Sequence, residues 1–145
     1  MSQVVVGGTF NVFHKGHMKL LDAAITAAAL KESVLVVGIT SDTFAQASRN
    51  VSVRPYNERL QDVREYVESD DLRPHFGPTA YLRIDSADQM PVMKDDDVLV
   101  VSEETCMNAY QVLADKEYGC QVYVVDMVKD KNGEEIHSTK IIEGP

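Results

Sequence analysis

The fold is indicated first by residues 4–17, which read Val4-Val5-Val6-Gly7-Gly8-Thr9-Phe10-Asn11-Val12-Phe13-His14-Lys15-Gly16-His17. Three β-branched valines that end at two glycines are typical of a buried parallel strand. From Met18 to about Leu30, apolar residues recur at the spacing of one helix face. A strand, a short loop and a helix in this order form the first unit of an α/β sheet.

The same alternation of apolar strands and amphipathic helices continues to the end of the chain, with no internal repeat and no linker-like stretch. We therefore expect an α/β fold in which residues 1–145 form a single domain with one doubly wound, Rossmann-like parallel sheet. The predicted strands are Ser33 to Ile39, Asp97 to Val101 and Gln121 to Met127, with a weaker, irregular one from about Pro74 to Ile84. The predicted helices are the one marked by Leu60, Val63 and Val67 and the one from about Thr105 to Tyr118, which ends at Gly119 as a C-cap.

Composition favours a cytoplasmic globular protein. Its 145 residues are enough to bury a hydrophobic core, and no apolar run approaches the roughly 20 residues that cross a bilayer. The N-terminus has no basic segment of the kind that begins a signal peptide. Cys106 and Cys120 match no zinc-ligand spacing and are interpreted as reduced thiols.

The net charge of −9 limits the possible partners. Proteins that bind nucleic acid carry a basic face, so a nucleic-acid partner is not expected. The same charge repels phosphate ligands, which must then be held by backbone N–H groups, a few placed cations and a metal ion. The sequence should therefore contain a loop that cradles phosphate.

Residues 7–17 form such a loop at the first strand-to-helix turn. Gly7-Gly8 lets backbone approach a ligand closely, and Thr9 adds a hydroxyl and an N–H group. His17 stands at the helix start, where unpaired N–H groups and the helix dipole favour an anion. His14 precedes it by three residues and Gly16 leaves space, so both imidazoles could face one phosphate. The loop has neither the G-x-G-x-x-G pattern of dinucleotide sites nor the G-K-[ST] of a P-loop.

With this loop the chain resembles the nucleotidyltransferase superfamily that bears the H-x-G-H motif, which includes adenylyl- and cytidylyltransferases. The first match is G-G-T-F…H-x-G-H, with Asn11 where the superfamily usually has Asp. The second match is residues 136–141, Ile-His-Ser-Thr-Lys-Ile, which is similar to the late I-S-S-T-R-I or I-S-T-T-K-I segment. His137 replaces a small hydroxyl residue there, and Lys140 replaces a frequent Arg. The resemblance implies that this segment starts a short last helix and holds the β- and γ-phosphates.

Within the superfamily the chain resembles the archaeal and eukaryotic type of phosphopantetheine adenylyltransferase. The supporting stretches are Thr40 to Asp42, Val53 to Arg59 and Val100 to Thr105, whereas about Ser69 to Lys94 matches poorly. The resemblance implies transfer of AMP from ATP to 4′-phosphopantetheine, which gives dephospho-coenzyme A and pyrophosphate in coenzyme A biosynthesis. The acceptor phosphate is already a dianion at neutral pH, so no general base is required.

The resemblance also implies roles for individual residues. Catalytic roles are implied for His14, His17 and Lys140. Nucleotide contacts are implied for Gly8, Thr9, Phe10, His17, Ser102, Glu104, Ser138 and Thr139. Acceptor contacts are implied for Thr9, Arg49 and Arg54, although Arg49, Arg54 and Arg59 could equally be solvated surface cations. No residue is assigned as a metal ligand, because Mg²⁺ is expected to bind through the substrate phosphates.

Three alternatives stay open at this point. An FMN adenylyltransferase and a glycerol-3-phosphate cytidylyltransferase share the chemistry, and the I-x-S-T-K-I form does not separate them from the pantetheine enzyme. The V-V-S-E-E-T stretch that ends at Thr105 favours the pantetheine interpretation. A non-catalytic nucleotide-binding protein is the alternative of another class, and the intact histidines and late Ser-Thr-Lys count against it. The sequence assigns no oligomeric state.

Overall fold

A computed structural model describes residues 2–11, 13–47, 52–69, 78–86, 89, 91–126 and 138–143, of which 103–108, 110, 126 and 138–143 are described by backbone alone. In chain order the elements are β1 (Gln3–Gly8), α1 (Lys15–Lys31), β2 (Val34–Thr40), α2 (Asp42–Ala47), α3 (Tyr56–Val67), β3 (Thr79–Ile84), β4 (Val98–Ser102), α4 (Glu103–Lys116), β5 (Gln121–Asp126) and β6 (Ser138–Glu143). Within this part of the chain no helix has the length and apolar character of a membrane span.

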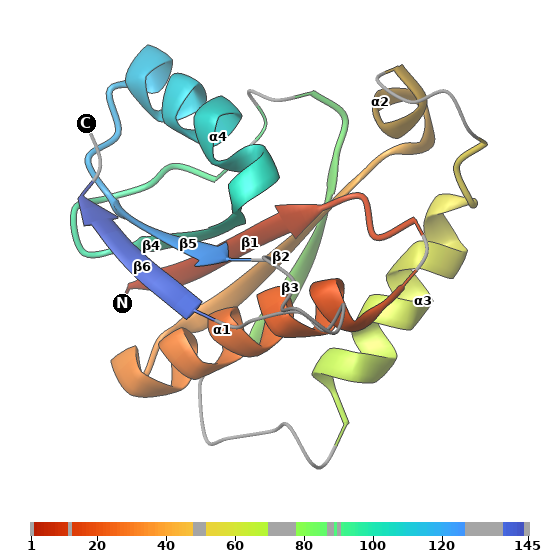
Figure 1. Cartoon of the computed structure of the whole chain (residues 1–145), viewed down its shortest axis with the longest axis horizontal. Coiled ribbons are helices and arrows are strands. Elements are labelled where there is room, and N and C mark those ends of the chain that lie inside the picture. The colour runs from red at the N-terminus through yellow and green to blue at the C-terminus, as the bar shows by residue number, and fades with distance from the viewer. Residues whose placement is uncertain are drawn as a thin grey trace, which may run out of the picture.

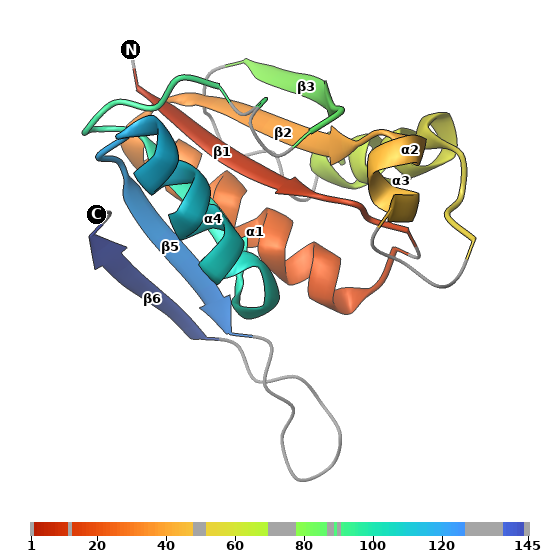
Figure 2. The ribbon, with the colours of Figure 1, turned by 90° about the horizontal axis from the view of Figure 1, so that it is seen from above.

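One six-stranded sheet has the strand order β3-β2-β1-β4-β5-β6 (Figure 1). The five strands β1 to β5 pair in parallel, and β6 pairs antiparallel with β5. Helices α1 and α3 cover one face of the sheet and α4 covers the other (Figure 2). The predicted doubly wound parallel sheet is therefore confirmed, with one antiparallel edge strand added.

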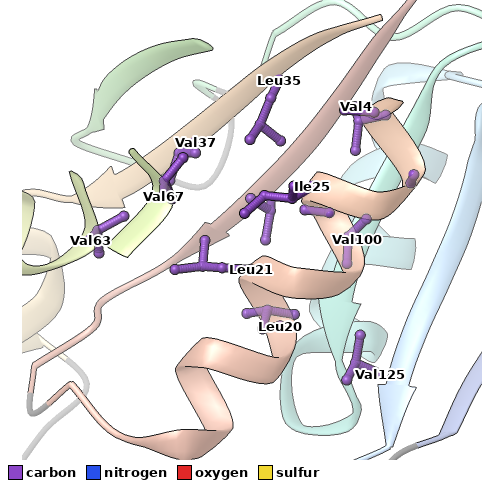
Figure 3. Packing of buried hydrophobic residues seen from close by; sticks show 14 of the residues in the cluster. Val4, Leu20, Leu21, Ile25, Leu35, Val37, Val63, Val67, Val100 and Val125 are labelled. Atoms are coloured by element: carbon purple, nitrogen blue, oxygen red, sulfur yellow. The ribbon is translucent and has the colours of Figure 1, made fainter. Parts of the chain in front are cut away.

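The core has two layers because successive strand residues point to opposite faces. The layer under α1 and α3 includes Val4, Leu21, Ile25, Val37, Val63, Val67 and Val100 (Figure 3). The layer under α4 includes Val5, Leu99, Val101, Leu113 and Val122. Burying each of these side chains contributes roughly 1.5–3 kcal/mol, so the two layers hold the sheet rigid beneath the loops at its carboxyl edge.

Three details differ from the sequence prediction. The loop after β2 contains a short helix, α2, that periodicity did not reveal. Helix α4 ends at Glu117, which adopts a left-handed conformation with φ of 58°, so the prediction of Gly119 as its C-cap is wrong. The third difference concerns Ser138–Glu143, which forms strand β6 and does not begin a helix. Thr139 and the β-branched pair at 141 and 142 favour a strand, and pairing with β5 satisfies that strand's outer hydrogen-bonding edge.

Candidate active site

The carboxyl end of β1 leads directly into the N-terminus of α1, where two histidines cap the helix. The Gly16 N–H donates to Nδ1 of His14 at 3.0 Å, and the His14 N–H donates to Nδ1 of His17 at 3.4 Å. His14 is the N-cap in an extended conformation and His17 is the third helical residue, so the pair forms a capping box built from imidazoles. The two rings stack with centroids 4.0 Å apart and planes inclined by 18°.

This capping determines which nitrogen of each ring carries the hydrogen. Since both Nδ1 atoms accept backbone N–H groups, both rings are the tautomer with hydrogen on Nε2. The cap already uses N–H groups of the first helical turn, since those of Gly16 and His17 donate to the His14 side chain. The site therefore offers an anion two parallel imidazole donors and the positive end of the helix dipole.

An aromatic cluster holds the ring of His17 in place. Phe10 meets it edge-on at a centroid distance of 5.1 Å, and the Phe13 ring lies at a centroid distance of 5.7 Å. Phe13 in turn contacts Tyr66 of α3 at 5.5 Å, and the Tyr66 hydroxyl donates to Oδ1 of Asp22 in α1 at 2.7 Å. Burial, together with this hydrogen bond, raises the pKa of Tyr66, so the hydroxyl remains a donor. The cluster ties the β1–α1 turn to both helices on this face.

Phe10 is buried, with only 1% of the residue exposed, and its ring belongs to the core. Its φ is 52°, a left-handed conformation that bulky residues rarely adopt. Gly8 makes room for the phenyl ring, since a Cβ at residue 8 would lie 3.2 Å from it. The buried ring is not available to a nucleotide, and nucleotide contacts by the Phe10 N–H group and by Gly8 stay predictions.

Thr9 lies between β1 and this turn and is nearly buried. The Thr40 hydroxyl at the end of β2 donates to the Thr9 hydroxyl at 3.0 Å, which leaves the Thr9 hydrogen for another acceptor. The Thr9 carbonyl accepts from Nη1 of Arg59 at 2.9 Å. The Thr9 hydroxyl therefore has its hydrogen to donate, and ligand binding by Thr9 stays a prediction.

Arg59 is not a surface cation, as the sequence allowed, but is fully buried on α3. Besides Thr9, its guanidinium donates to the Thr40 carbonyl at 2.8 Å, to the Arg54 carbonyl at 2.7 Å and to Oδ1 of Asp42 at 2.7 Å. The sequence did contain a signal for this burial. Arg59 precedes the buried Val63 by four residues, which places both on the same face of a helix.

Arg54 braces the loop between β1 and α1. Its Nη1 donates to the Asn11 carbonyl at 2.9 Å and to Oδ2 of Asp62 at 2.7 Å, while its backbone N–H donates to Oδ1 of Asn11 at 2.7 Å. Asn11, which departs from the usual Asp, thus keeps a side-chain oxygen acceptor at this position. The guanidinium already has these partners within the protein, and acceptor binding by Arg54 stays a prediction.

The remaining predicted residues lie at the same edge of the sheet or outside the described chain. Ser102 is the last residue of β4 and the N-cap of α4, and Glu104 is in that helix's first turn, its side chain not described. Residues 138–140 begin β6 opposite the carboxyl end of β5. Since β6 is three strand spacings from β1, their backbone lies roughly 14 Å from β1 across the sheet. Arg49 and His137 fall outside the described residues.

The described residues include no group of three or more His, Cys, Asp or Glu side chains that could hold a metal ion. Near the β1–α1 loop, Asp42 pairs with Arg59, and Asp62 pairs with Arg54. Binding of Mg²⁺ through the substrate phosphates stays a prediction.

Comparison with known proteins agrees with this geometry. A family model described as cytidylyltransferase-like matches residues 5–144, so the chain belongs to that family and the expected superfamily is confirmed. Its relatives include phosphopantetheine adenylyltransferases. The one from Methanothermobacter thermautotrophicus is 32% identical over 99% of this chain and 84% of its own length. The one from Pyrobaculum aerophilum is 31% identical over 98% of this chain and 92% of its own. A solved structure of a protein with unknown function from Archaeoglobus fulgidus has a TM-score of 0.70 and 31% identity, covering 85% of this chain and 97% of that one.

Proposed function

We propose that this protein is a phosphopantetheine adenylyltransferase that transfers AMP from ATP to 4′-phosphopantetheine and yields dephospho-coenzyme A and pyrophosphate. The observation that carries the proposal is the stacked pair of His14 and His17, whose capping bonds present two Nε2–H donors at a helix N-terminus. Relatives bearing that name match nearly the whole chain. The reaction belongs to coenzyme A biosynthesis in the cytoplasm, where a thiol such as the free Cys120 stays reduced.

The reaction is an in-line displacement at the α-phosphorus of ATP. An oxygen of the acceptor phosphate, a dianion at neutral pH, forms the new P–O bond. The bond from the α-phosphorus to the bridging oxygen breaks, and its electron pair leaves with pyrophosphate. No proton must be removed from the nucleophile, which agrees with a site built from donors.

Catalysis by this chain is then positioning and charge stabilisation. The Nε2–H groups of His14 and His17 contact the oxygens of the α- and β-phosphates, where negative charge grows, and the positive end of the α1 dipole faces the same oxygens. The Phe10 N–H and the Thr9 hydroxyl add donors from the end of β1. Magnesium, when bound with the nucleotide, neutralises part of the triphosphate charge.

Pyrophosphate release in the presence of Mg²⁺ tests the proposal. ATP and CTP are each offered with 4′-phosphopantetheine, FMN or glycerol 3-phosphate, and the products are identified by mass spectrometry. We expect turnover with ATP and 4′-phosphopantetheine. Turnover only with FMN, or only with CTP and glycerol 3-phosphate, would replace the proposed acceptor. Binding of Mg–ATP without turnover on any acceptor would indicate a non-catalytic nucleotide-binding protein.

A further inference from the structure

Arg59 is a buried cation on a helix face that is otherwise apolar. Its side chain is fully buried, and the next residues on the same face of α3, Val63 and Val67, are apolar. Removing a guanidinium from water is costly unless its N–H groups find acceptors, and those of Arg59 do. An apolar side chain at residue 59 could not bind backbone carbonyls and so could not fix their direction.

The carbonyls that Arg59 binds lie at the edge of the sheet where the site is. One guanidinium nitrogen, Nη1, joins the Thr9 carbonyl after β1 at 2.9 Å to the Thr40 carbonyl that ends β2 at 2.8 Å. Nη2 is held from the other side by Asp42 at 2.7 Å. The fixed fork of the guanidinium thus sets the relative positions of two strand ends.

The bond to Thr9 also orients the next amide. The peptide between Thr9 and Phe10 is trans and planar, so its carbonyl and its N–H point in opposite directions. When Arg59 draws the carbonyl toward α3, the Phe10 N–H is directed away from α3. The conformation is a strained one, with φ of 52° at Phe10, and such strain persists only where the surroundings enforce it.

Phe10 is held from both ends. On one side its buried ring packs edge-on against His17 at 5.1 Å, and on the other side the carbonyl before it is bound by Arg59. We propose that Arg59 is a positioning residue for nucleotidyl transfer, because it holds the Thr9–Phe10 peptide with its N–H facing the phosphate beside His14 and His17. This inference rests on the proposed function. Loss of a pre-aligned donor of this kind costs about 10²-fold to 10³-fold in rate.

Two substitutions test the role of the guanidinium. Arg59→Lys keeps the charge but replaces the fork with one ammonium, which cannot bind the Thr9, Thr40 and Asp42 acceptors in the same geometry. Arg59→Ala leaves a space that free guanidinium can enter at millimolar concentration, far below the molar concentrations that unfold proteins. Arg64→Ala is the matched control, since Arg64 is an exposed arginine of the same helix that pairs with Glu68.

We expect kcat to fall about 10²-fold in both Arg59 variants, with the KM for ATP changed only a few-fold, in protein shown to be folded by circular dichroism. Added guanidinium should restore kcat in Arg59→Ala and leave Arg64→Ala unaffected. A folded Arg59→Lys variant with a kcat near that of the wild type would overturn the inference. A loss of kcat that guanidinium does not restore would also overturn it. If the Arg59 variants do not fold, Asp42→Asn, which keeps the acceptor and removes its charge, should lower kcat in the same way.

A second measurement does not depend on turnover. The ¹⁵N-labelled amide of Phe10 should shift downfield when Mg–ATP binds the wild-type protein and should fail to do so in Arg59→Lys. A shift of equal size in both proteins would contradict the positioning role. If wild-type protein shows the shift but transfers AMP to no acceptor, the proposed function fails while the role of Arg59 in phosphate binding is retained.

Discussion

The imidazole of His14 lies nearly parallel to that of His17, with ring centroids 4.0 Å apart. Each ring uses Nδ1 to accept a backbone N–H of the same helix start, so the two side chains share the cap and have the same tautomer. Structural and chemical roles therefore reside on different nitrogens of each ring. A substitution that keeps an acceptor at the position of Nδ1 but removes the Nε2–H donor can distinguish the two roles.

His17→Asn should separate the cap from catalysis. The Asn Oδ1 can occupy the position of Nδ1 and accept the His14 N–H, whereas nothing replaces the Nε2–H donor. We expect kcat to fall at least 10²-fold while stability changes by less than about 0.5 kcal/mol. His17→Ala, the matched variant, should lose a similar rate and about 1 kcal/mol of stability. Pyrophosphate release and urea unfolding measure the two effects, and a near-normal kcat in either folded variant would contradict the mechanism.

Gly8→Ala should disturb the site through Phe10. The new Cβ would lie 3.2 Å from the Phe10 ring, so the ring that supports His17 must shift by a few tenths of an ångström. We expect roughly a tenfold loss of kcat, since small displacements of aligned donors are expensive. Gly7→Ala makes only an ordinary contact of 3.5 Å with the Gly38 carbonyl and should lose less. Steady-state rates of the two variants, compared at the same temperature, decide the prediction, which is wrong if their order is reversed.

Asn11→Asp should be tolerated, because residue 11 needs an oxygen acceptor for the Arg54 N–H and lies beside that guanidinium. We expect stability to be unchanged or raised by up to about 1 kcal/mol, since hydrogen bonds to charged groups are stronger. Asn11→Leu removes the acceptor and should cost about 1–3 kcal/mol. Urea unfolding measures both variants. A large loss of stability in Asn11→Asp would show that the contact between residue 11 and Arg54 requires the neutral amide.

Cys120 should make stability fall at alkaline pH. Burial raises the pKa of its thiol from 9.0 to about 11, so between these values the unfolded chain loses a proton that the folded chain keeps. The free energy of unfolding is therefore supported fully below pH 9 and declines as the pH rises toward 11. Between pH 8 and 10.5, wild-type protein should lose roughly 2 kcal/mol more than Cys120→Ala, measured by urea unfolding. Equal losses of stability in the two proteins would mean that folding does not change the pKa of the thiol.

Local sequence determined much of the fold and the centre of the site. Strand β1, the glycine turn and helix α1 follow each other within residues 3–31, and their signals are the spacing of apolar residues and the placement of glycine and histidine. His14, His17, Thr9 and Phe10 belong to that one turn. The proximity of His14 and His17 follows from the chain itself, because residues three or four apart on a helix start lie together.

Tertiary structure decided what depends on partners distant in sequence. The sequence placed Arg59 on a helix, but its burial depends on the carbonyls of Thr9 and Thr40, which lie 50 and 19 positions away. Likewise, residues 138–143 form a strand because the edge of β5 offers hydrogen bonds, although their pattern predicts a helix start. Periodicity reports which residues share a face, whereas the neighbour that meets this face is set only when the sheet assembles.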